Sequence, residues 1–356
     1  MHQTTFSNSL IISILKKLIL LLIIITKFAI FANGLTSRSR IKWTAMKGQN
    51  RKFYPDIINH CYQRTINGDL LFYNVYDYLV FFTIFCIKAP KYGVRVYKLC
   101  QMPDHIHNSS SAKRKKDLTE FTQVYTAMYA REHNLVCHEE GSVFQSPFGS
   151  VPKVGDKRAR SNLIYVDNNP VERHLVQKAE EYHWNYLAYA KCNNPFSKPL
   201  TINNASKAMQ EAVQIVDIWH KEEKYLSYYM LKRLFSPLDK EEKKQLVDYI
   251  ITTYNILDYD GASAFFDGYE DMLTATHSVT GSEYDLNEVF VGKSDACYNQ
   301  MTSILMNTGR FKDIHDIFAL SLEERMELFR MLNNRTDATL EQIAKYLHIP
   351  FKHQQN

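Results

Sequence analysis

The stretch from residue 56 to residue 102 constrains the fold of this chain more than any other part of the sequence. The run "DIINHCYQRT" at 56–65 is rich in β-branched and aromatic residues and predicts a strand. "YDYLVFFTIFCIKAPKYG" at 76–93 has apolar residues all round a helix, which predicts a buried helix closed by its Pro and Gly. "VRVYKLCQM" at 94–102 predicts a second strand. Strand, helix and strand in this order favour a sheet with a helix packed on it.

Two further helices are expected before the chain changes character. One runs from Leu118 to about 134, and "KRARSNLIYVDNNP" predicts another, which Pro170 closes soon after. The intervening "GSVFQSPFGSVPKVGDK" is expected to be a loop. These elements predict an α+β domain with a sheet covered on one face, although its last strand is not evident from the pattern.

Helical patterns dominate from Asn203 to Leu347, so a domain boundary is expected near 195–203. The resulting scheme has a leader or mis-assigned start at 1–45, a first domain at 46–195, a helical region of unknown role at 203–320 and a helix pair at 321–352. Capping boxes at Ser321 and Thr339 begin the two helices of that pair. This helix pair resembles a helix-turn-helix motif. In that case the second helix would reach base edges of DNA through Glu341, Gln342, Lys345 and Tyr346. The alternative is an ordinary helical hairpin.

The chain ends and the cysteines bear on the compartment. Six cysteines are scattered without a CxxC pair, which excludes a disulfide framework or a zinc ribbon and favours a reduced, cytoplasmic setting. Residues 9–32, "SLIISILKKLILLLIIITKFAIFA", instead suggest a signal peptide or a short membrane anchor. A third interpretation is upstream sequence ahead of a true start at Met46. The net charge of +5 is compatible with a polyanionic partner.

Two short motifs carry the chemistry. In "MPDHIH", His105 and His107 are two residues apart and share one face of a strand, so they are a candidate pair of metal ligands. In "YVDNNPV", Tyr165 and Asn169 are four apart and share one face of a helix. Asn169 is a neutral oxygen donor suited to Mg²⁺ or Mn²⁺, and a phenol beside such an ion is a candidate nucleophile toward phosphate. Taken singly, each residue is more often structural.

Residues 50–190 resemble the HUH single-tyrosine transposases, in particular the REP-associated tyrosine transposases. The resemblance rests on "INHCYQRTINGDLLF", "MPDHIH", "GSVFQSPFG", "YVDNNPVERHLV" and "YHWNYLAY", which occur in the family's order. It implies a ferredoxin-like antiparallel sheet with helices, followed here by a mostly α-helical C-terminal region.

The resemblance also implies an activity and its residues. His105, His107 and Asn169 would bind Mg²⁺ or Mn²⁺, and Tyr165 would attack a phosphodiester of single-stranded or hairpin DNA, leaving a 5′-phosphotyrosine link. Such enzymes usually act as dimers. An enzyme acting on DNA works in the cytoplasm, so a mis-assigned start becomes the better explanation of residues 9–32 and membrane association is not expected.

The sequence departs from the family's pattern after His107, and it contains further tyrosines and basic residues that bear on the site. Asn108, Ser109 and Ser110 stand where the family's strand continues with hydrophobic residues, so we expect a shortened strand. Tyr125 and Tyr129 are rival nucleophiles or core aromatics. Two basic clusters, solvated or in contact with DNA phosphates, are expected; they comprise Lys113, Arg114, Lys115 and Lys116, and Lys153, Lys157, Arg158 and Arg160.

The sequence is compatible with three functions. The first is metal-dependent cleavage and strand transfer of single-stranded DNA through a phosphotyrosine. The second is a domesticated relative that binds DNA hairpins with weak cleavage or none. The third is a membrane or exported metalloprotein, which only residues 9–32 support.

Overall fold

A computed structural model describes residues 52–66, 68–278 and 294–350. They all belong to one compact unit of the chain. The apolar run at 9–32 and Met46 lie outside these residues. Within the described ranges, no helix combines the length and the apolar character needed to cross a membrane.

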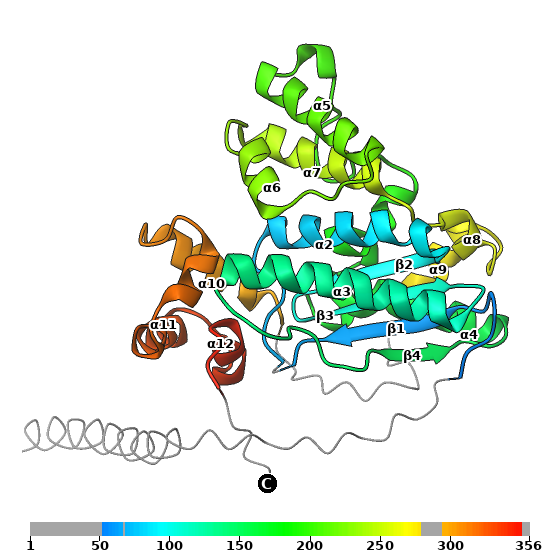
Figure 1. Ribbon diagram of the computed structural model, residues 1–356, viewed down its shortest axis with the longest axis horizontal. Helices are drawn as coiled ribbons and strands as arrows, with labels where there is room; N and C mark the ends of the chain where they lie inside the picture. The colour runs from blue at the N-terminus through cyan, green and yellow to red at the C-terminus, as the bar shows by residue number, and fades with distance from the viewer. Residues whose placement is uncertain (1–51, 67, 279–293, 351–356) are drawn as a thin grey trace, which may run out of the picture. The chain divides into compact units, whose positions relative to one another are not determined.

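The first half of the chain folds as a four-stranded antiparallel sheet with two helices (Figure 1). The strands stand in the order β2-β3-β1-β4. Along the chain the elements are β1 (Asn59–Arg64), α2 (Val75–Lys88), β2 (Arg95–Met102), β3 (His105–Ser111), α3 (Lys115–Cys137) and β4 (Gly149–Pro152). This βαββαβ order is that of a ferredoxin-like fold, which confirms the predicted fold class.

Helix α2 forms the centre of the main core. Asn74 caps its N-terminus by accepting a hydrogen bond from the backbone nitrogen of Tyr76, at 2.8 Å. Every side chain from Asp77 to Ile87 is buried, as expected for a helix that is apolar all round. One side packs against α3 and the sheet, and the other packs against helices from later in the chain.

Both faces of the sheet are covered, so the prediction of a sheet covered on one face was wrong. Ile106 of β3 packs into the core of α2 and α3. On the opposite face, α4 (Asp156–Glu172) packs its Tyr165 and Val166 against Cys100 of β2. The polar sequence of α4 hid this packing, because two of its buried side chains, Asn162 and Asp167, meet the sheet through polar contacts.

Strand β3 runs through residues 108–110 to Ser111 and is buried throughout, so the expected shortening was also wrong. The strand is central, with β1 and β2 bonded to its two sides. Its polar side chains have partners: Ser109 Oγ donates to Asn162 Oδ1 of α4 at 2.9 Å, and Ser110 Oγ donates to Asn108 Oδ1 at 2.7 Å. Buried serines are tolerated in a strand when their hydroxyls are satisfied in this way.

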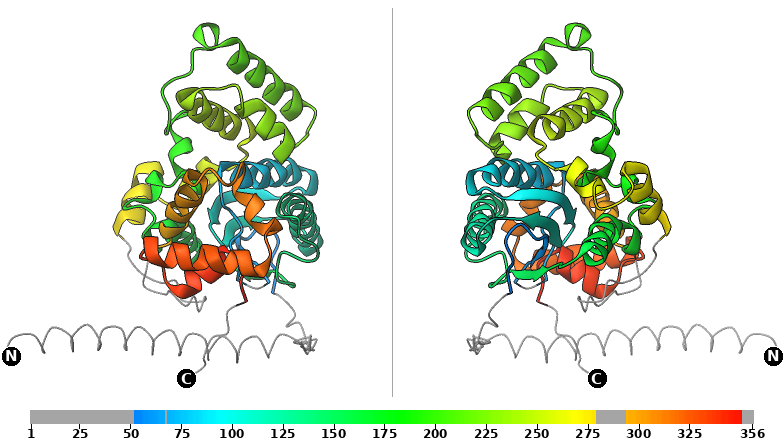
Figure 2. Two further views of the ribbon diagram at one scale, coloured as in Figure 1. Left: turned by 90° about the vertical axis from the view of Figure 1, so that its left-hand side faces the viewer. Right: turned by 90° about the vertical axis from the view of Figure 1, so that its right-hand side faces the viewer.

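The second half is helical, as predicted. Short 3-10 turns at 179–190 and 202–204 lead into α5 (Lys207–Lys221), α6 (Tyr228–Phe235), α7 (Lys240–Tyr254), α8 (Tyr259–Ser263), α9 (Tyr269–Ser278), α10 (Cys297–Asn307), the 3-10 helix η6 (Ile314–Ala319), α11 (Leu322–Arg335) and α12 (Leu340–Tyr346). The segment 195–203, where a domain boundary was expected, does not divide the hydrophobic core, because residues from both sides of it pack together. Phe82 and Phe85 of α2 share one core with Leu231 of α6 and Ile250 of α7, which lie beside α2 in Figures 1 and 2.

Helices α10 to α12 form a second core with residues that flank α2 and end α3. Leu70 and Tyr73, which precede α2, and Cys137 at the end of α3 pack with Met301, Leu332 and other residues of these helices.

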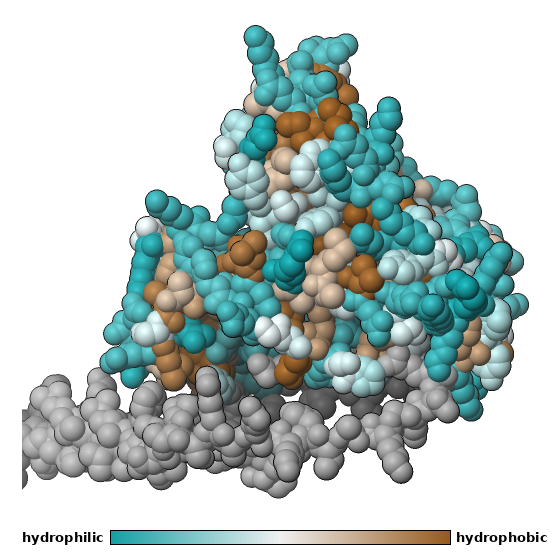
Figure 3. Space-filling model, in the orientation of Figure 1, coloured by the Kyte–Doolittle hydropathy of each residue, from teal (hydrophilic) through white to brown (hydrophobic). Residues whose placement is uncertain are grey.

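In the view of Figure 3, apolar residues form several separate patches with hydrophilic side chains between them. Such scattered exposure is ordinary for a protein surface.

Candidate active site

Three histidines gather on the face of the sheet that α4 covers. His105 and His107 are two residues apart on β3, and His60 stands on the neighbouring strand β1. His60 pairs with Ser109, two residues beyond His107, so the two rings are diagonal neighbours. All three are buried, and His105 is the most exposed at 2%.

Each histidine of the "HIH" pair is held through its Nδ1 atom. His107 Nδ1 shares a hydrogen bond of 2.9 Å with Nε2 of His60. His105 Nδ1 lies 2.5 Å from Oδ1 of Asp104. The centroids of the two rings are 4.8 Å apart. Any metal-binding role would therefore fall to their Nε2 atoms.

Tyr165 of α4 lies against this histidine group. Its ring centroid is 5.4 Å from that of His60 and 5.5 Å from that of His107, both edge to face. The phenol is 5% exposed. The structure thus brings together Tyr165, His105 and His107, which the two sequence motifs proposed as one site.

Two buried polar contacts fix α4 on the sheet. One is the bond from Ser109 to Asn162 described above. The other is the ion pair between Lys98 Nζ of β2 and Asp167 Oδ2 of α4, at 2.6 Å. Burial raises the pKa of Asp167 even though Lys98 acts against it. These anchors lie on either side of Tyr165 in the sequence and set the depth of its ring.

Asn169 follows Tyr165 by one helical turn and is 1% exposed. Its amide nitrogen donates to the backbone oxygen of Tyr165 at 2.8 Å. This bond leaves the amide oxygen as the atom that a cation would use. Its role as a ligand stays a prediction.

The surroundings of the His105 ring suit a ligand of a divalent cation. His105 Nε2 is buried and has no hydrogen-bond partner among the described residues, while Nδ1 of the same ring is held by a carboxylate. Metal-binding histidines commonly show this carboxylate support. In the part of the chain that the structure describes, no three side chains of His, Cys, Asp or Glu are assembled as a metal site. A cation would therefore need the Asn169 oxygen as well.

The carboxylate that supports His105 is itself held by the C-terminal region. Lys345 of α12 forms an ion pair with Asp104. Burial would raise the pKa of Asp104, but Lys345 and His105 outweigh it and hold that pKa well below its ordinary value. Asp104 is thus ionised and accepts from His105, which favours the ring form with its lone pair on Nε2.

The Asp104→Ala variant tests this support. Loss of a carboxylate behind a metal-binding histidine typically lowers metal affinity about 10–100-fold. We expect a loss of that size for Mn²⁺, measured by titration calorimetry on the full chain. The exposed Asp267 offers a matched control, and Asp267→Ala should bind Mn²⁺ as the wild type does. Equal affinities for the wild type and Asp104→Ala would remove His105 from the proposed ligand set.

The helix that was considered for base recognition is turned into the protein. Tyr346 is fully buried, and its backbone oxygen accepts from Tyr73 Oη at 3.0 Å. Gln342 is 6% exposed and donates to the backbone of Ser294. With Lys345 paired to Asp104, the face expected to read bases instead packs against other parts of the protein. Capping boxes predicted where the helices begin, but not which face they bury.

The basic clusters differ in exposure. Lys157, Arg158 and Arg160 are exposed on the first turns of α4, whereas Lys153 is 5% exposed. The residues of the 113–116 run are exposed at the start of α3. They follow the end of β3 that lies about 20 Å from His105 along the strand. Lys157, Arg158 and Arg160 precede Tyr165 by five to eight residues on the same helix, about 8–12 Å along its axis, so this cluster would be the better placed of the two if DNA bound at Tyr165.

The rival tyrosines lie on the other face of the sheet. Tyr125 and Tyr129 of α3 are buried, and their rings contact Phe81 of α2 at centroid distances of 5.6 and 5.3 Å. Burial raises the pKa of both phenols. Their position supports the interpretation of core aromatics.

Sequence reasoning missed two residues of the site, His60 and Tyr62. Both stand on the α4 face of β1, and the Tyr62 ring centroid is 5.9 Å from that of His60 and 6.5 Å from that of His107. The alternation in "NHCYQ" was a usable signal, because residues two apart in the opening strand share a face. Only the register with β3 reveals that this face meets the "HIH" pair.

Gly149 of β4 makes room for Tyr62. The two residues pair across the strands, and a Cβ atom at position 149 would lie 2.0 Å from Cζ of Tyr62. Gly149→Ala should therefore displace the ring and cost about 1–3 kcal/mol in the free energy of unfolding, measured in urea. In a Tyr62→Ala background the same change should cost far less. Equal costs in the two backgrounds would show that the ring is not what the glycine accommodates.

Comparison with solved structures shows a likeness in fold, whereas two comparisons of the sequence show none. No family model matches the sequence, and no curated protein matches it. Among solved structures, the chain is similar to a REP-associated tyrosine transposase bound to a REP hairpin, at 12% sequence identity and a TM-score of 0.36. The alignment covers 40% of this chain and 84% of that one.

Proposed function

We propose that the protein cleaves single-stranded DNA through a covalent link to Tyr165 and transfers the strand from that link. One observation carries the proposal: the phenol of Tyr165 lies against His60 and His107, with His105 beside them, in a buried polar group between sheet and helix. Imidazoles next to a phenol on a fixed scaffold are the components needed for nucleophilic attack on a phosphodiester.

The step would exchange one phosphate ester for another. The Tyr165 oxygen bonds to phosphorus as the bond from phosphorus to the 3′ oxygen breaks. The phenol loses its proton, and the departing 3′ oxygen gains one, so no net charge is created. Strand transfer is the reverse reaction with a different 3′ hydroxyl. No oxidant or nucleoside triphosphate is required, because the ester energy is conserved in the phosphotyrosine.

A divalent cation would supply charge neutralisation at the phosphate oxygens. His105 and His107 through Nε2, and Asn169 through its amide oxygen, would hold it. Mg²⁺ or Mn²⁺ suits a set that mixes imidazole and oxygen donors with water. His60 would keep the ring of His107 in place through the bond to its Nδ1.

Incubation with end-labelled DNA hairpins carrying a single-stranded flank tests the proposal. With Mn²⁺ or Mg²⁺ we expect a protein–DNA species that survives denaturation, and with EDTA we expect none. The 3′ end released by cleavage should be a hydroxyl. Hairpins that bind without any adduct, across both metals and several flank sequences, would contradict the proposed activity.

That contrary result would favour the second function, hairpin binding without cleavage. One observation speaks for it: Tyr165 and the histidines are 5% exposed or less, so the phenol does not face solvent in this conformation. Under this alternative, the exposed Lys157, Arg158 and Arg160 would still contact DNA phosphates. Binding would then weaken with rising salt, and substitution of Tyr165 would not change it.

A further inference from the structure

A pocket of about 230 Å³ lies beside His105, where the end of β1 meets the C-terminal helices. Arg64 and Thr65, at the end of β1, line it together with Asp295 and Lys345 from the C-terminal region. The volume is below the range of pockets for drug-sized ligands, so it suits a smaller, single group. The C-terminal region is needed to close this pocket.

The pocket is polar and balanced in charge. Its charged residues are three cations and three carboxylates, a formal sum of zero: Arg64, Arg173, Lys345, Asp104, Asp295 and Glu341. A highly charged ligand such as a free phosphate would gain little from such a wall. A neutral group with several hydrogen-bond donors and acceptors on one edge would gain most.

Asp295 is the residue of this wall that most needs a ligand. It is 6% exposed, and its Oδ2 atom has no hydrogen-bond partner among the residues that the structure describes. Arg173 pairs with it at long range only: its Nη1 atom lies 3.9 Å from Oδ2, beyond hydrogen-bond distance. A buried carboxylate oxygen without a donor is costly, and a ligand donor in the pocket would remove that cost.

We propose that the pocket binds one unpaired guanine of the DNA strand next to the cleavage site. The Asp295 carboxylate accepts from N1–H and the 2-amino group, and Arg173 or Lys345 donates to O6. This inference rests on the proposed function for its choice of DNA as ligand. It goes beyond that function by naming the base and the residue that selects it.

The edges of the four bases decide between them. Guanine presents one acceptor followed by two adjacent donors, which matches a cation beside a carboxylate. Adenine and cytosine each offer one amino donor next to a ring nitrogen that repels a carboxylate, and thymine flanks its single N–H with two carbonyl oxygens. A base read outside the helix is recognised through this edge.

Binding of short oligonucleotides to the full chain tests the inference. Fluorescence anisotropy would compare thymidine nonamers with a central guanine, inosine or adenine, in EDTA so that no cleavage occurs. A good bidentate pair discriminates by about 1–3 kcal/mol, so we expect guanine to bind roughly 5- to 100-fold more tightly than adenine. Inosine, which lacks the 2-amino group, should lose most of that advantage.

Asp295→Asn should abolish the preference for guanine over inosine, and the exposed Asp267→Asn should keep it. The comparison of guanine with inosine on the wild-type protein needs no variant, so it holds even if Asp295→Asn folds poorly. Equal affinities of the wild type for the three oligonucleotides would overturn the inference. An adduct in the hairpin assay without base preference would refute the pocket alone, and preference without an adduct would refute the cleavage alone.

Discussion

The Tyr165→Phe variant should form no covalent DNA adduct. The change keeps the ring that packs against His60 and His107 and removes only the oxygen that would attack phosphorus. Without that oxygen no phosphate ester to the protein forms at this position, so adduct formation should fall to background in the hairpin assay. Hairpin binding by the same variant should be close to that of the wild type.

Tyr125→Phe is the matched control, because Tyr125 is equally buried but lies on the opposite face of the sheet. It should form adduct at the wild-type rate. Adduct formation by Tyr165→Phe at more than background would refute Tyr165 as the nucleophile. Tyr62, which also borders His60, would then be the next phenol to replace.

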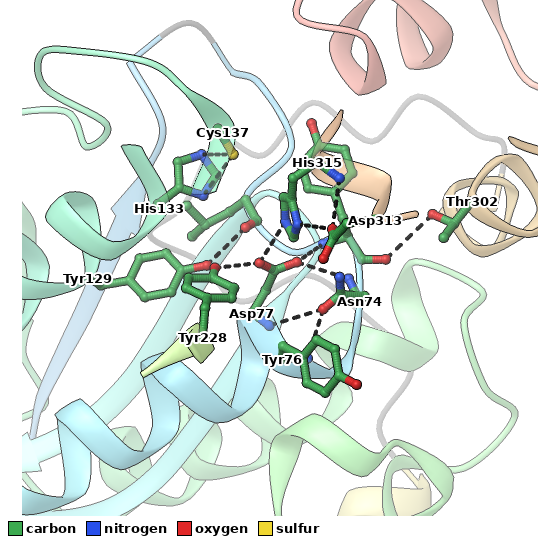
Figure 4. A network of polar contacts seen from close by, with 12 residues as sticks. Asn74, Tyr76, Asp77, Tyr129, His133, Cys137, Tyr228, Thr302, Asp313 and His315 are labelled. Carbon is green, nitrogen blue, oxygen red and sulfur yellow. Dashed lines mark hydrogen bonds and ion pairs between the residues drawn. The ribbon is translucent and has the colours of Figure 1, made fainter. Parts of the chain in front are cut away.

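The His315→Leu variant should lose about 3–5 kcal/mol in the free energy of unfolding, the usual cost of removing one member of a buried ion pair. His315 of η6 lies between two carboxylates, with Asp77 Oδ1 at 3.0 Å from Nε2 and Asp313 Oδ1 at 2.6 Å from Nδ1 (Figure 4). Asp77 also accepts from the backbone nitrogen of Tyr73 at 2.7 Å and from the hydroxyl of Tyr228. The network therefore joins α2, α6 and η6.

The stabilisation of the fold by His315 should depend on pH. Burial would lower the pKa of His315, but the two carboxylates outweigh it and raise that pKa from 6.5 to about 9. The stabilisation from His315 is therefore complete below pH 6.5 and is lost as pH rises through 9. The pKa values of Asp77 and Asp313 are lowered, so their contribution is present above about pH 4 and disappears in acid.

Urea unfolding at pH 6 and pH 10 tests both points. The wild type should be more stable than His315→Leu by the full amount at pH 6, and the difference should shrink at pH 10, where His315 is neutral. The exposed His138→Asn is a control that should change stability little at either pH, because residue 138 has a φ of 55° and asparagine adopts that conformation readily. A difference that is the same at both pH values would show that the charge of His315 does not stabilise the fold.

The sequence predicted those elements whose own pattern is decisive. The buried helix α2 is apolar all round, and β1 and β2 contain β-branched and aromatic runs, so their positions followed without the structure. The shared face of His105 and His107 followed from the two-residue period of a strand. The βαββαβ order followed from these elements and the family resemblance together.

Other features depend on partners that lie far away in the sequence. Strand β4 is four residues long and exists because it pairs with β1. The serines of β3 are tolerated in the sheet because Asn162 of α4 and Asn108 satisfy their hydroxyls. No local pattern contains this information, which is why residues 108–110 were expected to interrupt the strand.

The same reason limited the prediction of the site. His60 reaches His107 only through the register of β1 with β3. Lys345 reaches Asp104 only because α12 docks beside the turn between β2 and β3. The two motifs predicted that Tyr165 lies near the "HIH" pair, and tertiary packing supplies the residues that hold these side chains in place.

Identification of the amino acid joined to DNA tests the central claim most directly. The wild-type protein would be incubated with a hairpin of known sequence and Mn²⁺, digested with protease and nuclease, and the modified peptide sequenced by mass spectrometry. We expect a nucleotide joined through its 5′ phosphate to Tyr165, in the peptide that contains "SNLIYVDNNPVER". A link at another residue, a link through a 3′ phosphate, or unmodified Tyr165 in a reaction that cleaves the hairpin would contradict it.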